Sequence, residues 1–111
     1  MSLLFFIDND NSFSLITDED KNIKVGSLMT MKSDGKASLC KNGDFPIGFV
    51  KMFQTTKFVQ IVRTGRIGGF EDLIPGKVYY SGSCVPGKLS EIDNGYPVGL
   101  ALSKHAIQII I

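Results

Sequence analysis

Short apolar segments, separated by glycine and proline, run along the whole chain. Glycine, proline, Asn-Gly or Asp-Gly recurs about every eight to twelve residues, and the intervening segments are rich in Val, Ile, Phe, Tyr and Thr. The segments carry no convincing helical period, and their spacing is typical of an all-β sandwich or barrel. Strands are predicted at residues 3–7, 13–17, 27–32, 47–53, 57–63, 77–81, 98–102 and 106–111, with shorter pairings at 37–40 and 88–91.

The breaks between strands have the chemistry of particular turns. Asn-Gly and Asp-Gly pairs offer the positive φ angles of tight hairpins. Pro-Gly pairs fit type II turns, in which proline fixes one φ angle and glycine accepts a positive one. These pairs stand at residues 34–35, 42–43, 75–76, 86–87 and 94–95. The glycine-rich segment Thr64–Gly69 is predicted to be a loop or a linker between two halves.

One pattern of turns and strands occurs twice in the chain. Gly26 and Gly76 open the two copies 50 residues apart, and Phe45–Val50 matches Tyr96–Ala101 at an offset of 51. Two turns match at an offset of 52, and all these features keep their order, which indicates a structural repeat. The closing apolar strands match at an offset of 48, at residues 59–62 and 107–110.

We therefore predict a single all-β domain over residues 1–111, built from two pseudo-repeated antiparallel units. Residues 1–22 form an N-terminal arm, residues 23–66 the first unit and residues 70–111 the second. One unit cannot bury its apolar face alone, whereas two packed together can.

Six glycines have structural roles in this repeat. Gly48 and Gly99 each follow a strand-opening proline by two residues and are predicted to mark a bulge or a close backbone crossing. The first hairpin is predicted to be three residues longer than the second, so that its tip projects from the body. The six positions are Gly26, Gly35, Gly48, Gly76, Gly87 and Gly99.

The composition is typical of a globular domain and argues against a dedicated nucleic-acid binder or a membrane-spanning chain. Hydrophobic residues make up 43% and charged residues 21% of the 111 residues, as in a globular domain. Twelve basic against 11 acidic residues give a charge of +1, which lacks the electrostatic footprint of a dedicated nucleic-acid binder. The apolar run Leu3–Ile7 is far shorter than the roughly 18–20 residues that span a bilayer. The N-terminus also lacks the pattern of a signal peptide.

Reactive side chains are few and scattered. His105 is the only histidine and has no evident catalytic partner, so neither a catalytic nor a cofactor site is predicted. The acidic stretches Asp8–Asn11 and Asp18–Asp20 lack the central glycine of a calcium loop, and we interpret them as solvated turns with no metal. Cys40 and Cys84 have no CxxC spacing, which favours reduced thiols over a disulfide framework or zinc site.

Basic and aromatic residues alternate on the long hairpin, at Lys51, Phe53, Lys57 and Phe58. They could form a stacking platform for single-stranded nucleic acid, or the two phenylalanines could simply be a cross-strand pair. Arg63 and Arg66 beside glycines could contact an anionic partner or be ordinary surface charge.

Both ends of the chain carry apolar strands without charged residues that would discourage pairing. Exposed edge strands of this kind invite pairing with another chain, and burial of each large side chain is worth roughly 1.5–3 kcal/mol. The alternative is that both strands lie centrally in the monomer's own sheets. The candidate oligomer or partner interface comprises Leu3, Leu4, Phe5, Phe6, Phe53, Phe58, Arg63, Arg66, Ile109 and Ile111.

Three segments of the second copy resemble a module common in structural proteins of tailed bacteriophages. They are Leu73–Tyr80, Val85–Leu89 and Tyr96–Ser103. Their pattern is similar to that of head-decoration (cement) proteins, head-fibre proteins and some tail-fibre segments. There, Pro-Gly precedes an aromatic pair, and a glycine turn leads to Val-Gly-x-Ala-Leu-Ser and a closing apolar strand. Together with the more generic first copy, the resemblance covers about residues 23–111.

The resemblance implies a non-enzymatic virion component, usually trimeric, located on the capsid surface. Its implied partner is the major capsid protein, whose subunits it would bridge on the outside of the shell. It implies no cofactor, small-molecule substrate or membrane, and makes nucleic acid an unexpected partner. The alternative is a tail or head fibre module that attaches to a host-surface glycan, and a third reading is a nucleic-acid-binding β-barrel.

Overall fold

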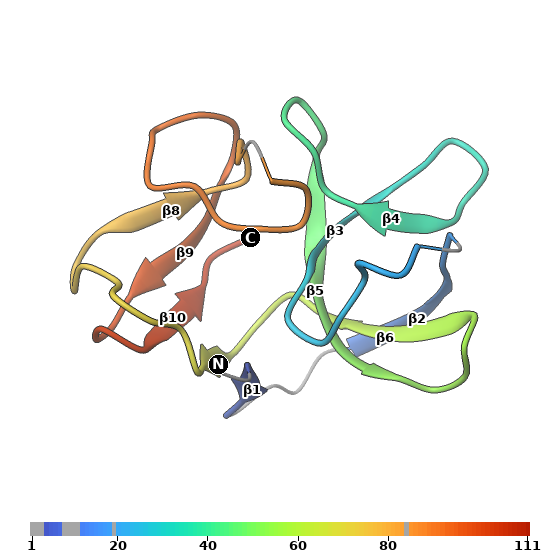
Figure 1. The fold of residues 1–111 in the computed structure, drawn as a ribbon, viewed down its shortest axis with the longest axis horizontal. Coiled ribbons are helices and arrows are strands. Elements are labelled where there is room, and N and C mark those ends of the chain that lie inside the picture. The colour runs from blue at the N-terminus through green and yellow to red at the C-terminus, as the bar shows by residue number, and fades with distance from the viewer. Residues whose placement is uncertain (1–3, 8–11, 19, 84) are drawn as a thin grey trace.

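The succession of apolar segments and turns folds as two five-stranded antiparallel sheets packed as a sandwich (Figure 1). This computed structural model describes residues 4–7, 12–18, 20–83 and 85–111. The all-β class is confirmed. Of the two predicted architectures the sandwich is observed, because the pairings of the described residues do not close either sheet into a barrel.

The two sheets divide the chain between them. Sheet A contains, in spatial order, β1 (Phe5–Phe6), β7 (Arg66–Gly68), β10 (Ala106–Ile109), β9 (Pro97–Ala101) and β8 (Val78–Tyr80). Sheet B contains β2 (Ser12–Ile16), β6 (Phe58–Val62), β5 (Pro46–Phe53), β3 (Leu28–Met31) and β4 (Ala37–Leu39). Figure 1 shows sheet A on the left and sheet B on the right.

The two repeated units have the same strand pairing. Three consecutive pairs of β3 and β5 recur in β8 and β9, and a bulge interrupts both ladders at the same place. The pairs are Leu28–Phe49, Met29–Gly48 and Thr30–Pro46 in sheet B, and Val78–Leu100, Tyr79–Gly99 and Tyr80–Pro97 in sheet A. The repeat inferred from glycines and prolines is thus a repeat of backbone pairing.

The closing strands correspond differently from the prediction. Val62 pairs with Phe49, and Gln108 pairs with Leu100, so β6 and β10 correspond at an offset of 46 rather than 48. A slip of two residues keeps each side chain on its own face of the sheet, and the apolar pattern therefore does not detect it.

The same shift changes the relative lengths of the hairpins. Val50 pairs with Ile61, 11 residues further on, whereas Ala101 pairs with Ile107, 6 residues further on. The β5–β6 hairpin is therefore five residues longer than the β9–β10 hairpin, not three, and the residues of its tip, 54–58, are exposed.

Strand β7 lies inside sheet A, where a loop or linker was predicted. Ile67 is fully buried and pairs with Phe6 in β1 and with Ile107 in β10. Gly65 and Gly69, which flank the strand, have positive φ angles. One apolar residue among glycines is too weak a pattern to mark so short a strand. The predicted pairing at 88–91 is in turn reduced to a single bridge, Tyr80–Ser90.

The faces of the two sheets have different neighbours. We call the face bearing Met29, Val50 and Ile61 in sheet B, and Tyr79, Ala101 and Ile107 in sheet A, the inner face, and the opposite one the outer face. The outer row of sheet B, Leu28–Phe49–Val62, is fully buried in one core with the inner face of sheet A. The two units therefore stack head to tail, the outer face of the first on the inner face of the second.

Sheet B buries its own inner face. Val50 and Ile61 pack there with Leu15 of β2 and Ile23 of the following loop. The sheet curls until its two edges meet at one parallel bridge between Thr17 and Ala37, but this contact does not continue as a ladder.

The Gly87 peptide joins the two units by backbone hydrogen bonds. The N–H of Leu28 donates to the Gly87 carbonyl (2.9 Å), and the N–H of Gly87 donates to the Cys40 carbonyl (2.8 Å). The predicted type II turn at Pro86-Gly87 is present, since Lys88 N–H bonds to the Val85 carbonyl and the φ of Gly87 is positive. A turn of the second unit thus continues the β3–β4 ladder of the first.

The paired glycines Gly48 and Gly99 provide a matched stability test. Gly48 has a φ of +147°, and a Cβ there would lie 2.5 Å from the Val62 carbonyl oxygen. Gly99 lies outside the positive-φ region, so its backbone conformation does not require glycine. A Cβ there would lie 2.8 Å from the end of the Ile107 side chain, which can move more easily than a backbone carbonyl. We expect Gly48→Ala to cost about 2–4 kcal/mol in urea unfolding and Gly99→Ala about 1 kcal/mol. Equal costs would contradict this assignment.

Candidate functional surfaces

A cleft lies beside the tip of the long β5–β6 hairpin. Phe53, Thr55 and Thr56 come from the hairpin, and Asp18 and Asp20 come from the loop after β2. The cleft has a volume of about 760 Å³. An aromatic ring, hydroxyls, two carboxylates and the two lysines Lys21 and Lys57 are therefore gathered at the hairpin tip, although they come from two separate segments of the chain.

Hydrogen bonds fix the polar groups of this hairpin cleft. Lys32 Nζ contacts the Asp18 carboxylate at 2.8 Å, and this hydrogen bond raises the pKa of Lys32. Asp20 accepts the N–H of Asn22 at 2.9 Å. The Thr55 hydroxyl oxygen accepts N–H groups of the turn, including that of Phe58 at 3.1 Å, which leaves its own proton available for donation.

A second cleft, of about 840 Å³, lies at the junction of the two units. Leu4, Phe70 and Leu73 supply apolar lining, and charged groups of both signs stand around it. Asp72 at its margin has a φ of 57°, the one positive φ among the described non-glycine residues. The mixed charges do not define a particular ligand class.

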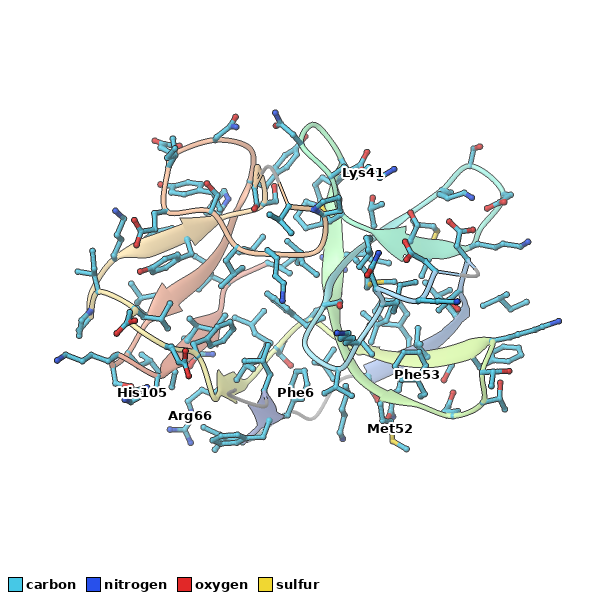
Figure 2. The ribbon with its side chains drawn as sticks, viewed as in Figure 1. Phe6, Lys41, Met52, Phe53, Arg66 and His105 are labelled. Carbon is cyan, nitrogen blue, oxygen red and sulfur yellow. The ribbon has the colours of Figure 1, made fainter. Side chains whose placement is uncertain are left out.

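The two hairpin phenylalanines do not form a common platform. Phe53 pairs with Val59 and lies on the inner side of sheet B, whereas Phe58 pairs with Ile16 on the outer side. Their exposed fractions are similar, 40% and 42%. A bulge between Val50 and Met52 shifts the alternation along β5, and Figure 2 labels Met52 and Phe53 on this strand. The cross-strand pairing of Phe53 with Phe58 is therefore wrong.

The predicted N-terminal interface residues have different environments. Phe5 is 55% exposed on the outer face of sheet A, with its ring against Gly68. Leu4 and Phe6 pack against the core between the units. Leu3 lies outside the described residues.

The C-terminal strand is central rather than at an edge. β10 lies between β7 and β9, which buries Ile109, while Ile111 packs against the same core. The alternative of central strands therefore holds for this end of the chain, whereas β1 is an edge strand. Of the two arginines, Arg63 is exposed after β6, and Arg66 lies half-buried in β7 opposite Gln108 (Figure 2).

The remaining candidate groups have structural partners. His105 is exposed, and its Nδ1 lies 2.9 Å from the carbonyl oxygen of Phe70. In the described part of the chain, no group of three or more His, Cys, Asp or Glu side chains could hold a metal ion. The stretch Asp8–Asn11 and Glu19 lie outside the described residues.

Four exposed apolar side chains on or directly beside the strands are not among the predicted interface residues. Leu102 and Ile7 are exposed on the outer face of sheet A, and Met52 and Ile16 on that of sheet B. Period-two alternation along predicted strands could have found them, because it places Leu100 and Leu102 on one side and buried Ala101 on the other.

Comparisons with known proteins gave no relative. No family model, curated protein or solved structure matches the chain. Across the described residues, no helix has the length and apolar character needed to cross a membrane.

Cys40 offers a test of the buried junction. It is a free thiol, and burial raises its pKa to about 12. Because the thiolate is the reactive form, we expect native Cys40 in a Cys84→Ser background to react with a thiol reagent at pH 8 about three orders of magnitude more slowly than an unperturbed cysteine. Denaturant should restore the ordinary rate. Rapid labelling of the folded protein would contradict the burial of this thiol.

Proposed function

We propose that the protein is a non-enzymatic virion structural protein that decorates the outside of a capsid as a homotrimer and bridges neighbouring capsid subunits. The observation that carries this proposal is the apolar surface on strand faces. Phe5, Ile7 and Leu102 on sheet A and Ile16, Met52 and Phe58 on sheet B are all large and exposed. Exposed apolar surface is typical of protein interaction sites.

The fold suits a role based on adhesion. Two stacked units are joined through a buried core and the Gly87 turn, and the six apolar groups stand on strands or directly beside them. A symmetric oligomer of such bodies binds a repetitive shell with high avidity even where each single contact is weak. The resemblance of residues 23–111 to head-decoration proteins supports the same conclusion.

Sedimentation with shells tests this proposal. The purified protein is mixed with shells assembled from the major capsid protein of the same virus, and bound protein is measured in the pellet. We expect saturable binding, with a fixed number of chains per shell. Met52→Lys combined with Phe58→Lys should weaken binding at least tenfold if the sheet B face contacts the shell. Failure of the unmodified protein to pellet with shells would overturn the proposal.

The hairpin cleft favours a second candidate function, attachment to a host-surface glycan as part of a fibre. Phe53 presents an apolar ring to the cleft that holds Asp18, Asp20, Thr55 and Thr56. Sugars combine apolar C–H faces with dense hydroxyl groups, so a ring surrounded by carboxylate and hydroxyl oxygens matches them. Nucleic acid is a poorer match, because Phe53 and Phe58 lie on opposite faces and cannot stack bases together. The cleft also carries two carboxylates beside its two lysines, Lys21 and Lys57.

A glycan array with two matched variants tests this second function. Phe53→Ala should abolish glycan binding, because it removes the ring from the cleft. Phe58→Ala removes a ring of nearly equal exposure from the opposite face and should leave binding unchanged. Equal effects of the two substitutions, or no glycan bound by the unmodified protein, would exclude this site.

A further inference from the structure

The hairpin cleft opens at one end of the inner face of sheet B. Thr17 directly follows β2 and Lys57 directly precedes β6, each two residues away from a side chain of the sheet B core. Side chains two residues apart along a strand share a face, so both lie on the inner face together with Phe53. The N–H of Thr17 donates to the Lys57 carbonyl at 2.8 Å, which makes these two residues direct cross-strand neighbours.

The Thr17 hydroxyl is a buried polar group that the fold leaves unused. Thr17 is 6% exposed, and its hydroxyl makes no hydrogen bond to any residue that the structure describes. Burial of a hydroxyl without a partner is unfavourable, and such groups are uncommon in folded proteins. Because Thr17 lines the cleft, a ligand atom that accepts a hydrogen bond there would satisfy this hydroxyl.

Two lysines of the cleft also have hydrogen-bond donors to offer. Lys57 stands beside Thr17, and Lys21 comes from the loop after β2. Both lysines are exposed, and neither ammonium group has an ion-pair partner within the described ranges of the chain. An ammonium group donates hydrogen bonds and accepts none, and its strongest partners are anionic oxygens.

The two carboxylates of the cleft are already engaged. Both oxygens of Asp18 accept hydrogen bonds from Lys32 Nζ, at 2.8 and 3.0 Å, and Lys32 lies 3.8 Å from Asp34 as well. Asp20 accepts the N–H of Asn22 at 2.9 Å. Each carboxylate of the cleft thus already has a donor, whereas one buried hydroxyl and two ammonium groups lack an acceptor.

We propose that the hairpin cleft binds an acidic sugar, whose anionic group lies against the Thr17 hydroxyl and the Lys57 ammonium group. The recognised chemistry is an anionic oxygen group on a sugar ring, either a carboxylate or a sulfate. In this arrangement Phe53 contacts the apolar C–H face of the sugar, and the Thr55 hydroxyl donates to one of its oxygens. This inference rests on the second candidate function, glycan attachment, and names the class of glycan.

A glycan array with three sets of probes tests the class of ligand. The sets are neutral oligosaccharides, oligosaccharides that carry sialic or uronic acid, and sulfated oligosaccharides. We expect the unmodified protein to bind one of the two acidic sets about tenfold or more tightly than the neutral set, and the preferred set identifies the anionic group. Equal or tighter binding of neutral glycans would overturn the inference and leave glycan attachment standing. Binding of no glycan would overturn both.

Lys57→Gln and Lys41→Gln are a matched pair of variants. Each removes one ammonium group from an exposed lysine, but Lys41 does not line the cleft and lies away from Phe53 (Figure 2). We expect Lys57→Gln to weaken binding of the acidic glycan about tenfold, because a charge-assisted hydrogen bond is lost, and Lys41→Gln to leave it unchanged. Equal effects of the two substitutions would overturn the inference.

Thr17→Val separates ligand binding from a structural role. It replaces the hydroxyl by a methyl group of similar size. Because that hydroxyl has no partner in the described part of the protein, the melting temperature should stay the same or rise. We expect binding of the acidic glycan to fall about tenfold with Thr17→Val and to be retained with Thr17→Ser. Undiminished binding by folded Thr17→Val would overturn the inference.

Discussion

Burial of the outer row of sheet B beneath the inner face of sheet A is the interaction on which the rest of the structure depends. Leu28, Phe49 and Val62 are fully buried there, and each such side chain contributes roughly 1.5–3 kcal/mol. The contact fixes the two units as one body, and the Gly87 peptide then completes the ladder beside Leu28. Without this packing, the outer row of sheet B and the inner face of sheet A would both be exposed to water.

Head-to-tail stacking explains why equivalent positions carry different side chains. Val62 is fully buried under the second unit, whereas its counterpart Gln108 is half-buried and donates its side-chain N–H to the Gly65 carbonyl at 3.1 Å. The other two residues of the uncovered row are smaller than their buried counterparts: Val78 corresponds to Leu28, and Leu100 corresponds to Phe49. The uncovered row thus combines smaller apolar side chains with a polar group that is hydrogen-bonded within the chain.

The sequence predicts this architecture well where local chemistry decides it. The glycine and proline turns and the β3–β5 repeat are read correctly, because turn φ angles and bulges require particular residues. The shift of β10 by two residues is not predicted, because the alternation of apolar and polar residues along a strand is unchanged by a slip of two. Strand β7 is not predicted either, because three residues are too few to show an alternation. Without β7, the C-terminal strand is taken for an edge and Ile109 for a surface residue.

Candidate surfaces are harder to predict, because they depend on which strand face is left uncovered. The bulge at Lys51 separates Phe53 from Phe58, and no local pattern marks it. The five extra residues of the first hairpin place Phe53 and Thr55 beside Asp18, a cleft for which the shorter second hairpin has no equivalent residues. The first unit thus has a polar cleft, because its β5–β6 hairpin is longer. The second unit has an uncovered outer face, because no further unit packs on it within the chain.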